Sequence, residues 1–172
     1  MLFPQSSHRA YSPTDRLLIN ADHALRTLFG RSPTTERRNP ATALKESEIG
    51  DDQRRLVGRL MRINHTGEVC AQALYQGQAL TAKLPETRQR MERSAQEESD
   101  HLAWCAERLT ELGSHQSLLN PLWYAGSFAM GAAAGLIGDR WSLGFVVETE
   151  RQVESHLDDH LEQIPARDAK SR

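Results

Sequence analysis

The chain of 172 residues has the length of one domain and, with 38% hydrophobic residues, is apolar enough to fold. Its 21 basic and 23 acidic residues nearly balance at a net charge of -2, so we expect no nucleic-acid partner. The N-terminus has no basic stretch followed by an apolar run, so a secretory signal is not expected. Two isolated cysteines, Cys70 and Cys105, favour reduced thiols in a cytoplasmic compartment.

The first predicted element is a short amphipathic helix that begins after Ser12. The stretch Ser12-Pro13-Thr14-Asp15 combines a capping hydroxyl, a proline at the first helical position and an early acid. Residues 30–40 are polar and show no periodicity, so we expect an exposed, mobile linker there. We therefore divide the chain into an N-terminal helix with a flexible linker (1–45) and a helical bundle (46–172).

Two long helices are predicted next. The first spans about 51–83, a stretch without proline that repeats small and apolar residues at steps of three and four. The second runs from Pro85 to about Leu112 and ends at Gly113. It carries an unbroken seam for packing on other helices, formed by Met91, Ala95, Glu98, Leu102, Cys105, Leu109 and Leu112. The carboxylate of Glu98 therefore occupies a predicted core position.

The stretch from Gln116 to Gly138 contains 23 residues and no charge. A bilayer span needs about 20 predominantly apolar residues, and this stretch is diluted by polar residues, a proline and glycines. We therefore expect a buried or membrane-surface helix instead of a transmembrane one.

The last predicted helix runs from about Trp141 to Gln163 and again includes an acid, Glu150, on its apolar face. The final residues, 166–172, are small or polar and are expected to begin a connecting loop.

Carboxylates at core positions indicate a metal site, because an unpaired buried carboxylate costs on the order of several kcal/mol. Glu98 and His101 are three residues apart, so both can bind one ion from the same helix face. Glu68 and Glu150 add carboxylates from the preceding and the last helix. Oxygen and imidazole ligands favour iron or manganese, and we favour iron because it can activate oxygen.

The general two-iron bundle combines one Glu from each of two helices with a Glu-x-x-His from each of the other two. This chain contains the first half of that set. Among neighbouring acids, Glu97 lies off the seam and is interpreted as solvated. Glu148 and Glu154 flank Glu150 and could replace it, although both lie less centrally on the apolar face.

Other polar groups have simpler interpretations. His156 and His160 could bind a metal as a pair but are more often solvated, and His156 could instead orient a ligand. The basic groups within 54–62 and 88–93 are interpreted as solvated helix faces that could favour anionic lipid.

Four motifs make the sequence similar to the demethoxyubiquinone hydroxylases. They are Ile63-Asn64-His65-Thr66-Gly67-Glu68, Ala73-Leu74-Tyr75-Gln76-Gly77-Gln78, Glu97-Glu98-Ser99-Asp100-His101-Leu102, and Glu150-Arg151-Gln152-Val153 before His156-Leu157. Their order and separation match as well as their letters, and the resemblance covers residues 11–172.

The resemblance implies an all-α, ferritin-like di-iron monooxygenase that hydroxylates the ring of a polyprenyl methoxy-benzoquinol in ubiquinone biosynthesis. Its iron ligands fall on Glu68, Glu98, His101 and Glu150, with His156 and Tyr75 beside the site. Two ferrous ions are the implied cofactors and molecular oxygen the co-substrate. NADH or the quinol is the implied electron source.

The resemblance also implies a peripheral membrane protein on the cytoplasmic face of the cell membrane. The uncharged stretch would lie against the bilayer as the crossover helix and admit the prenyl chain. A second copy of the chain or other ubiquinone-biosynthesis proteins are the implied partners. Members of the family continue into a further helix with the second Glu-x-x-His, and this chain ends before it, so we expect a truncated bundle.

Two alternative functions use the same ligands. A ferritin-type protein would bind and oxidise iron without an organic substrate, although it has no need of the uncharged stretch. An inactive truncated remnant of the hydroxylase is the other alternative.

Overall fold

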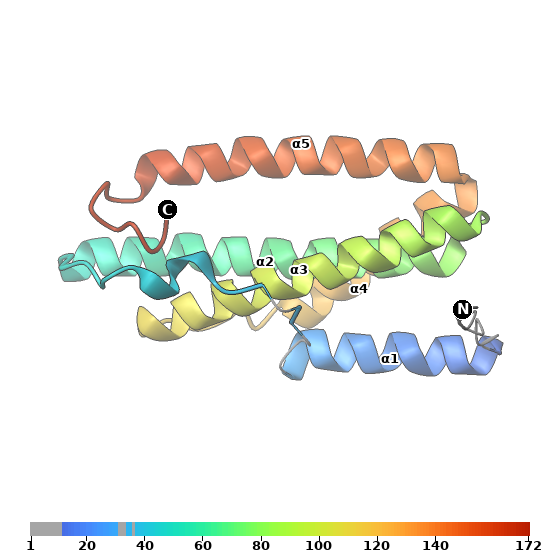
Figure 1. Cartoon of the computed structure of the whole chain (residues 1–172), viewed down its shortest axis with the longest axis horizontal. Coiled ribbons are helices and arrows are strands. Elements are labelled where there is room, and N and C mark those ends of the chain that lie inside the picture. Colours follow the sequence, from blue (N-terminus) through green and yellow to red (C-terminus); the bar gives the residue numbers. More distant parts are fainter. Residues whose placement is uncertain (1–11, 31–33, 36) are drawn as a thin grey trace, which may run out of the picture.

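The computed structural model describes residues 12–30, 34–35 and 37–172, and all regular structure within these ranges is helical. The helices are α1 (Pro13–Phe29), the 3₁₀ helix η1 (Pro40–Ala43), α2 (Asp51–Thr81), α3 (Pro85–Glu111), α4 (Asn120–Ile137) and α5 (Asp139–Gln163). In Figure 1, α2 and α3 form the centre, with α5 on one side and α1 on the other. The predicted all-α bundle is confirmed.

The helix α1 begins where the sequence predicts. The Ser12 side chain accepts a hydrogen bond from the Asp15 amide, and the Asp15 carboxylate accepts one from the Ser12 amide, which forms a capping box. The described residues of the linker contact α3: the Thr35 amide donates to buried Asp100 at 2.7 Å, and the Asn39 side chain donates to Glu107 at 2.8 Å. Residues 31–33 and 36 of the linker lie outside the described residues.

Helix α4 crosses α2 with the two backbones in direct contact. A Cβ atom at Gly131 would lie 2.1 Å from the Leu74 carbonyl oxygen, and one at Gly77 would lie 2.3 Å from the Phe128 carbonyl oxygen. The Thr81 hydroxyl also donates to the carbonyl oxygen of α4 residue Ala132 at 3.0 Å. Only glycine allows this approach, so the glycines of the uncharged stretch position α4.

The other side of α4 is apolar and exposed. Its exposed side chains, with the two leucines that precede the helix, are Leu118, Leu119, Leu122, Trp123, Met130, Leu136 and Ile137. Helix α1 likewise exposes Leu17, Leu18, Leu25 and Phe29. Within the described part of the chain, every helix is too short or too polar to span a bilayer.

Helix α5 packs on α4 and α2 and is otherwise largely exposed, with Ser142 and His160 as its buried residues. It is held to α2 through polar contacts. The Gln78 side chain donates to the carbonyl oxygen of Ser142 at 2.8 Å, and His160 Nδ1 lies 2.7 Å from Asn64 Oδ1. The predicted apolar face of α5 is therefore only partly covered, and Val153 and Leu157 remain exposed.

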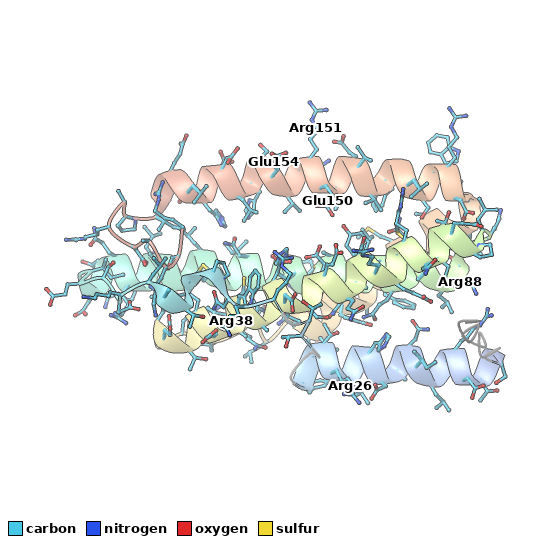
Figure 2. The ribbon with its side chains drawn as sticks, viewed as in Figure 1. Arg26, Arg38, Arg88, Glu150, Arg151 and Glu154 are labelled. Atoms are coloured by element: carbon cyan, nitrogen blue, oxygen red, sulfur yellow. The ribbon has the colours of Figure 1, made fainter. Side chains whose placement is uncertain are left out.

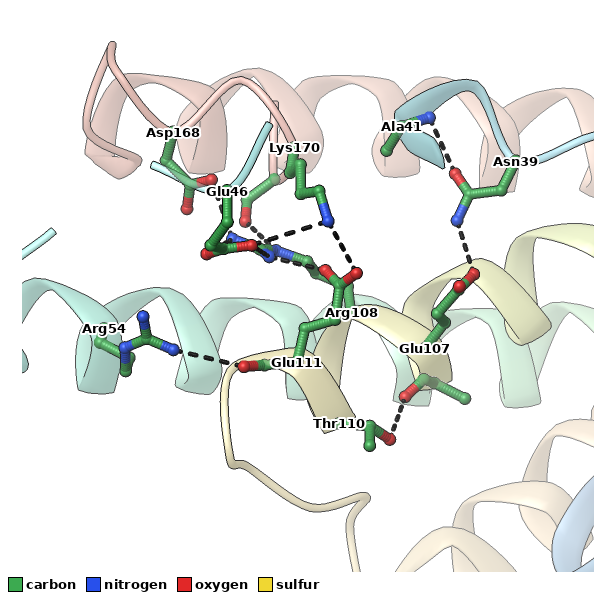
Figure 3. A network of polar contacts seen from close by, with 12 residues as sticks. Asn39, Ala41, Glu46, Arg54, Glu107, Arg108, Thr110, Glu111, Asp168 and Lys170 are labelled. Carbon is green, nitrogen blue, oxygen red and sulfur yellow. Dashed lines mark hydrogen bonds and ion pairs between the residues drawn. The ribbon is translucent and has the colours of Figure 1, made fainter. Parts of the chain in front are cut away.

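The C-terminal segment is packed against the bundle by an ionic network (Figure 3). Arg108 is buried and pairs with fully buried Asp168 at 2.9 Å and with Glu46 and Glu111 at 2.7 Å each. Lys170 pairs with Glu111 at 2.7 Å, and these cations hold the pKa values of Glu46 and Glu111 below their usual range. Residues 166–172 thus form turns, as expected of a connecting loop, but Asp168 and Lys170 anchor the segment to the bundle.

The crossing of α2 and α4 gives a stability prediction. We expect Gly131→Ala to lower the free energy of unfolding by about 1–3 kcal/mol, because the added methyl group collides with the backbone of α2. The matched control is Gly126→Ala on the same helix, where a Cβ atom meets nothing within 4 Å. The control should keep or slightly raise stability, since alanine favours a helix. Equal losses in chemical unfolding of the two variants would contradict the packing.

Candidate metal centre

Three of the four predicted ligands converge between α2 and α3. Glu68 of α2 and Glu98 and His101 of α3 place one ligand atom each within 4.8 Å of one another. His101 Nδ1 lies 3.2 Å from Glu98 Oε2 and 4.0 Å from Glu68 Oε2. The i, i+3 spacing of Glu98 and His101 puts both on one face of α3, as the sequence predicts.

A buried amide sets the register of α2 against α3 one turn from the cluster. The side chain of Gln72, four residues after Glu68, donates to the Ser99 hydroxyl at 2.7 Å and to the Ala95 carbonyl oxygen at 3.2 Å. Ser99 directly follows Glu98. This contact therefore holds the two glutamates level with each other.

The electrostatics of the cluster are those of a site with excess negative charge. Burial, reinforced by a hydrogen bond and repulsion from Glu98, raises the pKa of Glu68 to about 9. Burial also raises the pKa of Glu98, but hydrogen bonds from His101 and Glu68 outweigh it and lower the net value. The hydrogen bond to Glu98 raises the pKa of His101. In the protein alone, a proton on Glu68 relieves the repulsion between the two carboxylates, and a divalent cation can replace it at the same oxygens.

Glu150, the fourth predicted ligand, lies outside this cluster. It is exposed on α5 and accepts a hydrogen bond from the buried hydroxyl of Tyr75, and its charge contributes to the raised pKa of Glu68. In Figure 2, Glu150 lies on the side of α5 that faces the bundle, whereas Arg151 points away from it. Tyr75 thus links α2 to the predicted ligand of α5. Burial and Glu150 raise the pKa of Tyr75.

The acids that flank the predicted ligands in the sequence are exposed. Glu97 is exposed and pairs with Arg93 at 3.1 Å, as predicted for a solvated residue. Glu148 and Glu154 are both exposed on α5. Neither joins the cluster of ligand atoms.

The two histidines of α5 differ. His156 is exposed and its ring packs on His160, with 4.0 Å between the ring centroids. The prediction that His160 is solvated is wrong: the residue is 4% exposed and contacts Asn64 of α2. His160 precedes buried Ile164 by four residues, which was the available signal for an inward orientation.

Two buried groups near the cluster, His65 and Asp100, belong to the motifs of the sequence but were given no role there. His65 is buried one turn before Glu68, and burial lowers its pKa to about 4, which favours a neutral ring. Asp100 is fully buried and accepts hydrogen bonds from the amide and hydroxyl of Thr35.

An apolar groove of about 470 Å³ lies between α2, α4 and α5. Gly67 and Val153, which lie next to Glu68 and one turn after Glu150, place the groove close to the carboxylates. Its full lining is Arg62, Ile63, Asn64, Thr66, Gly67, Cys70, Ser117, Trp123, Val153, His156 and Leu157. A Cβ atom at Gly67 would meet nothing within 4 Å, so the missing side chain leaves the groove open.

The chain is similar to known proteins over nearly its whole length. A protein of Ectopseudomonas mendocina named 3-demethoxyubiquinol 3-hydroxylase is 63% identical over 167 residues, which cover 97% of this chain and 78% of the relative. Proteins of the same name from Pseudomonas fluorescens strain Pf-5 and Nitrosococcus oceani are 62% and 58% identical, over 97% and 95% of this chain and 78% and 77% of each relative. No solved structure matches the chain.

The profile of the family described as "Ubiquinone biosynthesis protein COQ7" matches residues 55–172, which contain every predicted ligand. The chain belongs to this family.

Proposed function

We propose that this chain is a 3-demethoxyubiquinol 3-hydroxylase that uses oxygen and two iron ions to hydroxylate the ring of a polyprenyl methoxy-benzoquinol. The half-buried cluster of Glu68, Glu98 and His101 is the observation that carries the proposal. The names of relatives about 60% identical favour this function over iron storage.

The donor atoms of the cluster fit iron, since two carboxylates and one imidazole are ligands that ferrous iron accepts. Bound iron supplies the oxygen-activating chemistry. Glu68 and Glu98 would hold the cation once their shared proton is lost to solvent, and His101 would offer it a neutral nitrogen. Glu150 adds a further carboxylate from α5, where Tyr75 holds it toward α2.

The apolar groove suits the prenyl chain of the substrate, because its lining is mostly apolar and includes Gly67, the residue before Glu68. The exposed apolar sides of α4 and α1 suit a position on the cytoplasmic surface of a membrane, where a prenylated quinol dissolves. The quinol itself or NADH supplies the electrons in this proposal.

Anaerobic reconstitution with ferrous iron tests the function. We expect the chain to bind two irons and to convert a demethoxyubiquinol analogue to its hydroxylated product when oxygen is admitted. Product is measured by mass spectrometry and iron by a colorimetric count per chain. Two irons with rapid ferrous oxidation and no product would favour a ferritin-type protein, and less than one iron would favour an inactive remnant.

Replacing the acid at the seam tests the ligand set. We expect Glu98→Gln to lower iron affinity by at least about 10-fold, because it removes a carboxylate that faces Glu68. Glu97→Gln is the matched control, since Glu97 is exposed and pairs with Arg93. Its iron affinity, measured by anaerobic titration, should stay near wild type. Similar losses in both variants would remove Glu98 from the site.

Filling the groove tests the substrate path separately from the metal. We expect Gly67→Leu to lower kcat/KM for a long-chain quinol by about 10-fold or more at unchanged iron content, because the new side chain occupies the groove. Gly144→Leu on α5 is the control, since its Cβ also meets nothing within 4 Å and it lies outside the groove lining. Normal kinetics of the Gly67 variant would exclude this groove as the path of the quinol.

A further inference from the structure

A second groove, of about 530 Å³, lies at the N-terminal end of α2, is rich in arginine and shares Arg62 with the apolar groove. The first three turns of α2 and the connection between α3 and α4 form its walls. Its lining is Asp51, Asp52, Arg54, Arg55, Gly58, Arg59, Arg62, Leu112, Gly113, Ser114 and His115. We call this the arginine groove. Neither the metal cluster nor the proposed substrate path requires so many cations.

Three of the four arginines have no acid to balance them. Asp52 pairs with Arg55 at 2.5 Å, but among the described residues no carboxylate lies within 4.0 Å of the guanidinium groups of Arg54, Arg59 or Arg62. Arg54 donates to the carbonyl oxygen of Glu111 at 3.2 Å, a neutral acceptor (Figure 3). The groove therefore has a local positive charge although the whole chain is nearly neutral.

Arg62 is fixed in place by neutral partners. Its Nε donates to the His115 carbonyl oxygen at 2.7 Å, and its terminal nitrogen donates to the Ser114 hydroxyl at 3.0 Å. The connection approaches α2 closely here, because a Cβ atom at Gly58 would lie 3.2 Å from the Ser114 side chain. The guanidinium is thus held at the groove with its charge uncompensated.

The arginine groove leads directly to the apolar edge of the molecule. One turn after Arg62, the Thr66 hydroxyl lies 3.2 Å from Asn120 Oδ1 at the start of α4. Leu118, which is 89% exposed, lies three residues after His115, and Trp123 projects from the first turns of α4. Cations beside exposed leucines and a tryptophan are the combination that binds an anionic bilayer surface, with phosphates at the cations and apolar side chains below them.

We propose that the arginine groove binds the headgroup phosphates of anionic lipids and thereby sets how the protein lies on the membrane. The inference rests on the proposed function only in that a hydroxylase of a prenylated quinol works at a bilayer. An anionic bilayer is favoured over a soluble polyanion because the apolar edge adjoins the cations, whereas a soluble ligand would leave that edge in water.

Vesicle sedimentation of the full chain tests this. We expect tighter binding to phosphatidylcholine vesicles that contain about 30% phosphatidylglycerol than to phosphatidylcholine alone, and loss of the difference in about 0.5 M salt. Arg59→Gln should weaken binding to the anionic vesicles about fivefold, and Arg59→Gln with Arg62→Gln about 30-fold. Binding to phosphatidylcholine alone should not change. Thermal unfolding of each variant shows whether it is folded.

The matched control is Arg151→Gln, which removes the same charge from the far side of α5, where Figure 2 shows the side chain pointing away from the bundle. It should bind anionic vesicles like wild type. Equal effects of Arg59→Gln and Arg151→Gln, or equal binding of wild type to both vesicles, would overturn the proposal. So would a soluble oligonucleotide that binds through Arg59 and Arg62 more tightly than the vesicles do.

The hydroxylase assay in detergent with a short-chain quinol separates this inference from the proposed function. Arg59→Gln should keep wild-type turnover there, because no bilayer is needed. Vesicle binding as expected with no product from any variant would overturn only the hydroxylase. Normal turnover with vesicle binding that ignores the two arginines would overturn only the lipid site.

Discussion

Two carboxylates that face each other inside a helical bundle are the constraint on which this molecule depends. Glu68 and Glu98 would repel if both were ionised away from water, and the pKa of Glu68 is raised first by its burial and then by its contact with Glu98. A fold that keeps them together must hold α2 and α3 firmly by other contacts. The Gln72 hydrogen bonds to Ser99 and Ala95 do this one turn away. The stabilising contacts thus lie beside the site, and the negative charge of the two glutamates is left for a bound cation to balance.

Helix α2 contributes to the metal cluster and also packs against α4, the helix with the exposed apolar surface. One side presents Glu68 to α3, another receives Glu150 of α5 through Tyr75, and a third packs against α4 at Gly131. Because α4 meets α2 backbone to backbone at its glycines, most of its larger side chains lie on the exposed apolar surface, and Tyr124 is the large side chain that it buries. The packing that closes the core therefore also produces the surface that suits a lipid.

Local patterns in the sequence were sufficient for the helices, the capping box at Ser12, and the spacing of Glu98 and His101, because these depend on residues a few positions apart. Contacts between distant residues were not predictable in this way. His160 is buried through Asn64 and Arg108 through Asp168, at separations of 96 and 60 residues. Glu150 was correctly placed on the side of α5 toward the bundle, but its exposure depends on how α5 packs, which no periodicity encodes.

The arrangement along α2 relates membrane contact to substrate access. Arg59 and Arg62 lie in the first half of α2, and Thr66 contacts Asn120 at the start of α4. Gly67, next to Glu68, lines the apolar groove. These residues follow one another within about three turns of one rigid helix. Because no hinge separates them, the orientation of the protein that the arginines set on a bilayer also fixes the orientation of the apolar groove. A prenyl chain that enters past Trp123 would meet the carboxylates at a depth fixed by the lipid headgroups. Helix α2 would therefore set both the position of the protein on the membrane and the depth to which the substrate enters the site.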